Sequence, residues 1–173
     1  MPTHPQQSGE AVSGHPGELL DRFLARLIDG VLLGIAYSIL SAIFSPIFRR
    51  GLVYSTGEIF LYSLFLSISF VAVAIGYFAY LESTRGQTLG KMLMKLEVHG
   101  PDGSLPTMEQ AVRRNAFYAI QLITIIPFVG WVVGPLASLA VVILIAVSIN
   151  NDPNRRQGYH DQFAGGTYVL KRG

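Results

Sequence analysis

Long runs without a charged residue constrain this 173-residue chain more than any other feature of its sequence. Residues 30–48 and 59–81 each contain no Asp, Glu, Lys or Arg. A membrane-spanning helix needs about 20 consecutive apolar residues. The composition agrees, because only 14% of the residues are charged, against about a quarter in ordinary soluble domains. The sequence therefore predicts an integral membrane protein with transmembrane helices at these two positions.

The stretch from Asn115 to Asn150 is also free of charge, and its length predicts how often it crosses the membrane. As one helix it would be about 52 Å long, whereas the hydrocarbon core is about 30 Å thick. Pro127, Gly130, Gly134 and Pro135 lie in its middle, where they favour a turn. The stretch is therefore expected to fold back. The expected hydrophobic segments are then four, at about 27–48, 59–81, 112–127 and 131–150.

The distribution of basic residues predicts the orientation of the chain. The loop from Glu82 to Asn115 and the tail after Asn150 are both rich in Lys and Arg, and cytoplasmic loops of membrane proteins show this enrichment. Both termini of this multi-pass protein are therefore expected in the cytoplasm. Residues 1–17 are rich in Pro, Gly and Gln and are expected to form a disordered cytoplasmic tail ahead of a membrane domain at 18–173.

The polar loop and the C-terminal tail carry patterns typical of strands. Apolar and polar residues alternate from Met94 to His99, which predicts a half-buried strand. Pro101-Asp102-Gly103 predicts the turn of a small hairpin, and the run Thr167–Leu170 could pair with residues 94–98. The expected fold is an all-α membrane protein, a bundle of four hydrophobic helical segments with a small cytoplasmic cap that contains a β-hairpin.

Three short polar motifs lie where the hydrophobic segments meet the expected membrane boundary. The first, DRFLARLID, places Arg22, Arg26 and Asp29 within about 60° of one stripe of a helix. Residues 30–48 would cover about 28 Å, nearly the whole hydrocarbon core. Asp29 is therefore expected at the interface and not at the midplane. The other two motifs are ESTRGQTLGK at 82–91 and NRRQGYHD at 154–161.

These motifs resemble those of the RDD family of small bacterial membrane proteins. The pattern R-x-x-A-x-x-x-D is matched by Arg22, Ala25 and Asp29. A G-Q-T-x-G-K segment is matched by residues 86–91, and an R-R-Q-G-x-H-D segment by 155–161, before a G-T-x-V ending at 166–169. The resemblance covers roughly residues 18–170. It implies a bacterial plasma-membrane protein, and for this family transport has been proposed, including cation/proton exchange for some members.

The resemblance also implies which residues would form the site. The signature charge cluster would consist of Arg22, Asp29 and Asp161. Supporting residues come from the same motifs: Arg26, Glu82, Arg85, Gly86, Gln87, Gly90, Lys91, Arg155, Arg156 and His160.

Two interpretations of these charged residues stay open. In the first they form an interfacial ion-pair network that holds the cap against the helices, since charges are less costly at the membrane boundary than at its centre. In the second they guard the mouth of an ion or solute path. The middles of the hydrophobic segments hold no ionisable residue other than tyrosine, and ion-coupled carriers usually place such groups there.

Several other function classes are disfavoured by the sequence. The chain has no cysteine, which excludes thiol nucleophiles and zinc–thiolate or iron–sulfur sites. GQTLGK has too few residues between its glycines for a phosphate-binding loop, and no serine lies in a glycine elbow. The net charge of +2 is small, so nucleic acid is not an expected partner. We expect a protein that is not an enzyme and uses no metal and no cofactor.

The leading hypothesis is participation in cation or small-solute transport, with the charge cluster at the cytoplasmic mouth. The alternative is an accessory or assembly subunit that packs against a larger membrane protein complex. Four helices are few for a carrier, so besides the lipid bilayer the expected partners are further copies of the chain or a larger membrane complex.

Overall fold

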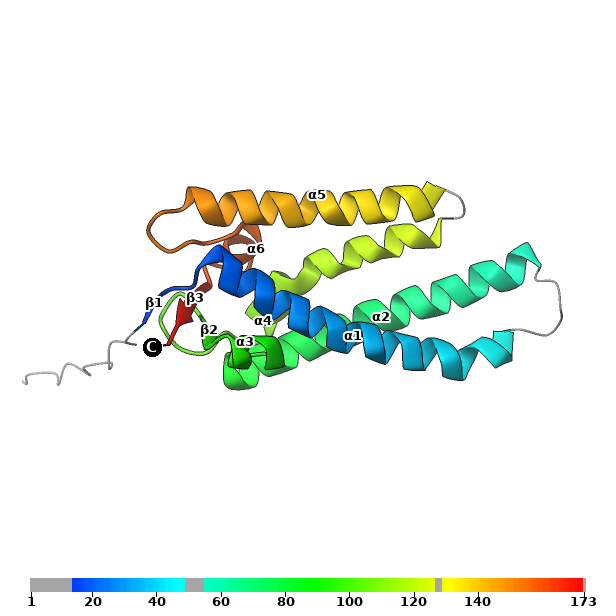
Figure 1. Ribbon diagram of the computed structural model, residues 1–173, viewed down its shortest axis with the longest axis horizontal. Coiled ribbons are helices and arrows are strands. Elements are labelled where there is room, and N and C mark those ends of the chain that lie inside the picture. The colour runs from blue at the N-terminus through cyan, green and yellow to red at the C-terminus, as the bar shows by residue number, and fades with distance from the viewer. Residues whose placement is uncertain (1–13, 49–54, 127–128, 173) are drawn as a thin grey trace, which may run out of the picture.

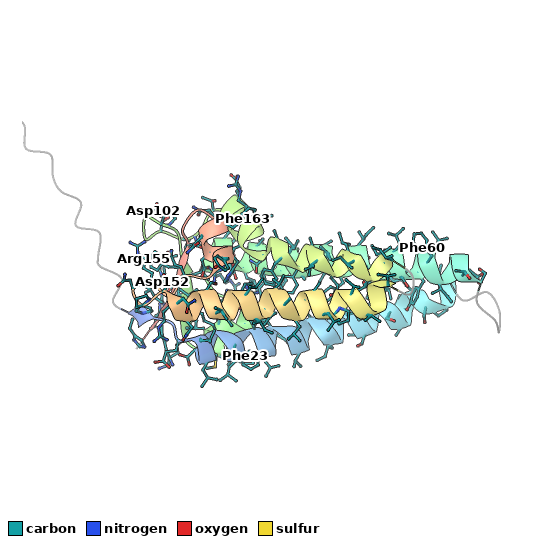
Figure 2. All side chains as sticks on the ribbon, turned by 90° about the horizontal axis from the view of Figure 1, so that it is seen from above. Phe23, Phe60, Asp102, Asp152, Arg155 and Phe163 are labelled. Atoms are coloured by element: carbon teal, nitrogen blue, oxygen red, sulfur yellow. The ribbon has the colours of Figure 1, made fainter. Side chains whose placement is uncertain are left out.

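The computed structural model describes residues 14–48, 55–126 and 129–172 (Figure 1). Long helices run along the molecule, and the strands and short helices gather at one end, which we name the polar end (Figure 1). In Figure 2 the labelled Asp102, Asp152 and Arg155 lie at this end, whereas Phe60 lies near the opposite end. The elements are β1 (His15–Pro16), α1 (Leu19–Phe48), α2 (Thr56–Arg85), α3 (Leu89–Leu93), β2 (Leu96–His99), α4 (Met108–Asn115), the 3-10 helix η1 (Ala116–Ile125), α5 (Val129–Asn151), α6 (Tyr159–Phe163) and β3 (Tyr168–Lys171).

Three helices of the described part of the chain are long and apolar enough to cross a membrane. They are α1, α2 and the segment Val132–Asn151 of α5, with mean hydropathies of 2.1, 2.3 and 2.7 over their most apolar windows. At 1.5 Å per residue the 30 residues of α1 or α2 extend about 45 Å, which exceeds a hydrocarbon core of about 30 Å. Each can therefore span the core and still carry its charged end into the polar end.

The prediction of four hydrophobic helical segments is wrong at the third segment, 112–127. Its described residues form the end of α4 and the 3-10 helix η1, and residue 127 lies outside the described residues. Ten residues of 3-10 helix rise about 20 Å, which is less than the hydrocarbon core. The polar helix α4 is held at the polar end, because Arg114 and Asn115 are buried there among charged partners. The apolar residues that follow are too few for a full span.

The sheet at the polar end has the strand order β1-β3-β2, and both pairings are antiparallel. The predicted pairing between the C-terminal run and residues 94–98 is confirmed, with Glu97 opposite Leu170 and Val98 opposite Val169. The predicted hairpin is wrong, because β2 pairs with β3 from the far end of the chain. The expectation of a half-buried β2 is also wrong, since all four of its residues are buried.

Contacts on both sides explain the full burial of β2. Leu96 and Val98 pack with Ala25 of α1 and Val169 of β3 in one apolar cluster. On the other side, the His99 ring stacks on Tyr168 with centroids 5.6 Å apart. Alternation alone could not indicate that the polar residues of this strand also have partners.

The tail predicted to be disordered extended to residue 17, but the described fold begins before that residue. Residues 1–13 lie outside the described residues, but residues 14–17 belong to the folded part. His15 pairs with Lys171, and the Gly17 N–H donates to the Val169 carbonyl at 3.0 Å. These are main-chain contacts, which a polar, proline-rich composition does not exclude.

Candidate functional site

Seven charged side chains meet inside the polar end, and we name them the buried charge network. Its three carboxylates are fully buried, and its basic side chains come from α1, α3 and α4. Taking such charges out of water is costly unless each finds partners. The members of the network are Arg22, Arg26, Asp29, Glu82, Lys91, Arg114 and Asp161.

Asp29 connects α1 to the second motif. Its carboxylate accepts hydrogen bonds from the Tyr77 hydroxyl at 2.8 Å, the Thr88 hydroxyl at 2.6 Å and the Gly90 N–H at 2.8 Å. Thr88 is also the N-cap of α3, where its side chain accepts from the Lys91 N–H. The G-Q-T-x-G-K segment therefore folds into a cradle for one carboxylate.

The other residues of that segment hold the cradle in place. Gly86 has a φ of 67°, a left-handed conformation that suits glycine and ends α2. The Gln87 side chain donates to the Leu96 carbonyl at 3.0 Å. A Cβ atom at Gly90 would overlap the carbonyl oxygen of Ala25, so only glycine lets α3 approach α1 this closely.

Asp161 connects the third motif to the first. Arg22 Nη1 donates to Asp161 Oδ2 at 3.3 Å, and Arg114 pairs with Asp161 Oδ1. The Gly158 N–H donates to Oδ2 at 2.9 Å. The guanidinium of Arg22 also donates to the Gly17 carbonyl at 3.1 Å. The start of α1 is thereby attached to the C-terminal motif.

Glu82 is the carboxylate on which most of the basic side chains converge. Lys91 Nζ donates to Glu82 Oε1, and Asn115 Nδ2 donates to Oε2 at 3.1 Å. Arg114 Nε lies 3.4 Å from Oε2 and Arg26 Nη2 lies 3.9 Å from Oε1. Arg26 in addition donates to Asn115 and lies over the Phe78 ring, 4.1 Å from its centroid.

Burial and charge act in opposite directions on the titration of this network. Burial would raise the pKa of Asp161, but Arg114, His160 and Arg22 outweigh it and lower the pKa to about 2. Burial lowers the pKa of the Lys91 amine to about 7, and the charge of Glu82 opposes this. Asp161 is therefore ionised at neutral pH.

The predicted signature residues are divided between two contact sets. Arg22 and Asp161 are in contact, whereas Asp29 is bound by Tyr77, Thr88 and Gly90. Among the supporting residues, Arg26, Glu82, Lys91 and His160 lie in or beside the network. Arg85 and Arg155 are exposed, and Arg155 lies over the Tyr168 ring, 5.5 Å from its centroid. Arg156 is half-buried and has a φ of 50°.

Several functional residues were missed by the sequence reasoning. Thr88 lies within the matched second motif, so its cap position could have indicated it. Arg114 could have been found from helix periodicity, because it shares a face of α4 with the buried Ala111, whereas Arg113 pairs with the exposed Glu109. Gly158 and Thr167 lie within the matched third motif and its G-T-x-V ending, although neither was assigned to the site. Nothing in the sequence pointed to Tyr77 or Asn115 as site residues.

A cavity of about 450 Å³ lies beside the network, between α1, η1 and α5. Its basic lining consists of Arg22, Arg26, Lys91 and Arg114, and no described lining residue is Asp or Glu. The rest of the lining is mainly apolar. It consists of Leu19, Phe23, Leu27, Phe70, Phe117, Tyr118, Ile120, Gln121, Ser138, Val141, Val142, Ile145, Ala146, Ile149, His160 and Val169.

His160 should make the stability of the protein depend on pH. Burial lowers its pKa to about 3; Asp161 opposes this, whereas Arg114, Arg26 and Arg22 add to it. In the unfolded chain the ring titrates near pH 6.5. The folded state therefore resists protonation, so its stability is complete above about pH 6.5 and is lost as the pH falls toward 3. Between pH 6.5 and 5 the loss should be about 2 kcal/mol.

Thermal unfolding in detergent at pH 7 and at pH 5 measures this effect. A His160→Gln variant should lose less stability over the same interval, because glutamine does not titrate. Equal losses in the variant and the wild-type protein would show that His160 is not the responsible group.

Membrane-length helices with a closed charge network at one end define the class of this protein, a polytopic membrane protein. Within that class the chain belongs to the RDD family, whose model matches residues 16–165. The resemblance inferred from the three motifs is thereby confirmed. Comparison with curated proteins and with solved structures gives no match.

Proposed function

We propose that the protein is not an enzyme and takes part in the transport of a small anionic solute, which occupies the cavity between α1, η1 and α5. The observation that supports this proposal is the charge of the lining, which has four basic side chains and no described carboxylate. A cation in this cavity would be repelled, whereas an anion would find donors. The geometry therefore favours small-solute transport over cation transport.

The hydrogen bonds of the carboxylates also favour the transport of an anion over that of a cation. Asp29 already accepts three hydrogen bonds within the protein. Asp161 accepts from two arginines and a main-chain N–H. Such satisfied groups suit a rigid support for the cavity better than an exchangeable cation site. We propose further that the polar end faces the cytoplasm of a bacterial cell, because the basic connections lie there.

Uptake into proteoliposomes tests the proposal. Purified protein should move an anionic solute, either radiolabelled phosphate or succinate or a labelled anionic phospholipid, faster than protein-free liposomes do. With an enclosed pH-sensitive dye, a pulse of Na⁺ or K⁺ should produce no additional proton flux. An Ala146→Trp variant should abolish uptake, because Ala146 lines the cavity. Leu144→Trp is the matched control, since Leu144 lies on α5 outside the lining and is 56% exposed. Cation-dependent proton flux without anion uptake would contradict the proposal.

The exposure of α1 favours a second candidate function, that of an accessory subunit, because the rest of the chain covers little of this helix. Only 6% of its most apolar window is buried inside the chain. Further copies or a larger membrane complex could cover this surface in place of lipid. The same preparation distinguishes the two functions. Inactive protein that purifies with a stoichiometric partner would support the accessory role.

A further inference from the structure

The cavity beside the charge network has a polar and an apolar part in a definite order. Chain direction places Arg22 and Arg26 early in α1, and His160 just after α5, so the basic groups lie toward the polar end. Farther from the polar end, the walls are formed by Ile120 of η1 and by Val141 and Val142 of α5. A ligand with one charged end and one apolar end matches this order.

The cavity also presents polar atoms that the protein does not satisfy. Among the described residues, Arg26 Nη1, Ser138 Oγ and His160 Nδ1 are buried without a hydrogen-bond partner, and all three residues line the cavity. The His160 side chain is only 10% exposed. Buried polar groups of native proteins are normally paired. Ser138 precedes Val142 on α5 and so lies away from the polar end, whereas the Arg26 and His160 atoms lie toward it. The Arg26 and His160 atoms are therefore candidate contacts for the charged end of a ligand.

The charge of the network favours an anion at these atoms. With Lys91 protonated, three buried carboxylates face four positive side chains, which leaves one surplus positive charge. An anionic group in the cavity would balance it. Guanidinium groups suit phosphate well, because their planar N–H donors match its oxygens.

The apolar walls are open to the surroundings of the helices. Phe23, Leu27 and Val142 line the cavity and are 54%, 52% and 50% exposed. Phe23 is labelled on α1 in Figure 2, near the polar end. In a bilayer, lipid chains surround these residues. The cavity can thus be entered sideways from the membrane, and basic pockets between transmembrane helices are suitable sites for anionic head groups.

We infer that the cavity binds one anionic phospholipid, whose phosphate lies against Arg26 and His160 and whose acyl chain extends between α1 and α5. This inference depends on the proposed function, because it names the substrate class of the same site. The ligand is an amphiphile of the membrane and not a water-soluble anion.

Native mass spectrometry of the full chain tests the inference. Protein in detergent is titrated with phosphatidylglycerol, with phosphatidylcholine and with inorganic phosphate. Phosphatidylglycerol should bind as a single adduct, roughly tenfold more tightly than phosphatidylcholine, and millimolar phosphate should not displace it. Val142→Trp should lose the adduct, whereas Leu144→Trp should keep it.

The outcomes separate this inference from the proposed function. Phosphate that binds as well as the lipid, or displaces it, would overturn the lipid inference and leave an anion site. Equal binding of both lipids, or an adduct that Val142→Trp retains, would also overturn it. A specific adduct in a protein that shows no uptake would support the inference and contradict transport.

Discussion

Glu82→Gln is expected to destabilise the protein by about 3–5 kcal/mol, because it removes one partner of a buried ion pair and leaves the others uncompensated. The carboxylate is fully buried and lies against Lys91, Arg114 and Arg26. Because Gln keeps the shape of the side chain, the loss of stability measures the effect of removing the negative charge. The midpoint of thermal unfolding in detergent should fall by about 10 °C.

A second substitution tests whether the charge balance causes this loss. Lys91→Met added to Glu82→Gln returns the network to one surplus positive charge. The double variant should be more stable than the sum of the two single effects predicts, as expected for residues in contact. Glu109→Gln is the control, because that carboxylate is 71% exposed and its loss should change stability little. A Glu82→Gln variant as stable as wild type would show that the network does not hold the fold.

The sequence allowed the fold to be predicted where one physical rule decided the outcome. The charge-free runs predicted α1, α2 and α5, because a bilayer demands apolar side chains over a fixed length. The same rule failed for residues 112–127. Absence of charge cannot show that α4 is fixed at the polar end by Arg114, whose partners Glu82 and Asp161 are distant in sequence.

The candidate site was predictable only as a set of motifs. Residues of each motif could be located, and the stripe of Arg22, Arg26 and Asp29 was expected to find its partners in the loop after Leu81 and in the tail around Asp161. The contacts confirm this, since Arg22 lies beside Asp161 and Asp29 accepts from Thr88 and Gly90. The sequence could not show that the partners of Asp29 in the second motif would be uncharged donors.

The two contact sets support each other through α1. Asp29 attaches α3 to one part of this helix, and Arg22 attaches the C-terminal motif to its start. Between them Arg26 lines the cavity and lies near Glu82. A shift of α1 would therefore disturb both contact sets and the cavity. The structural and functional interpretations of the charged residues are thus compatible, since the network that holds the fold also forms the basic wall of the cavity.

Gly90→Ala is expected to destabilise the protein strongly, although alanine is the better helix former by about 1 kcal/mol. The added Cβ would overlap the Ala25 carbonyl and come within 3.0 Å of the Asp29 carboxyl carbon. Relief of this overlap requires α3 to move away from α1, which breaks the hydrogen bonds from Gly90 and Thr88 to Asp29. Hydrogen bonds to a charged group contribute about 1.5–3 kcal/mol each, so the unfolding midpoint should fall by about 10 °C.

Gly30→Ala provides the matched control. Gly30 directly follows Asp29 on α1, and an added Cβ there meets nothing within 4 Å. This variant should unfold at the wild-type temperature or slightly above it, because a helical glycine is replaced without a clash. The two variants make the same chemical change, one at a residue whose added Cβ meets Asp29 and one at a residue whose added Cβ meets nothing. If both variants unfolded at or above the wild-type temperature, helix propensity would govern the result. A loss confined to Gly90→Ala would show that close contact between α3 and α1 holds the second motif in place.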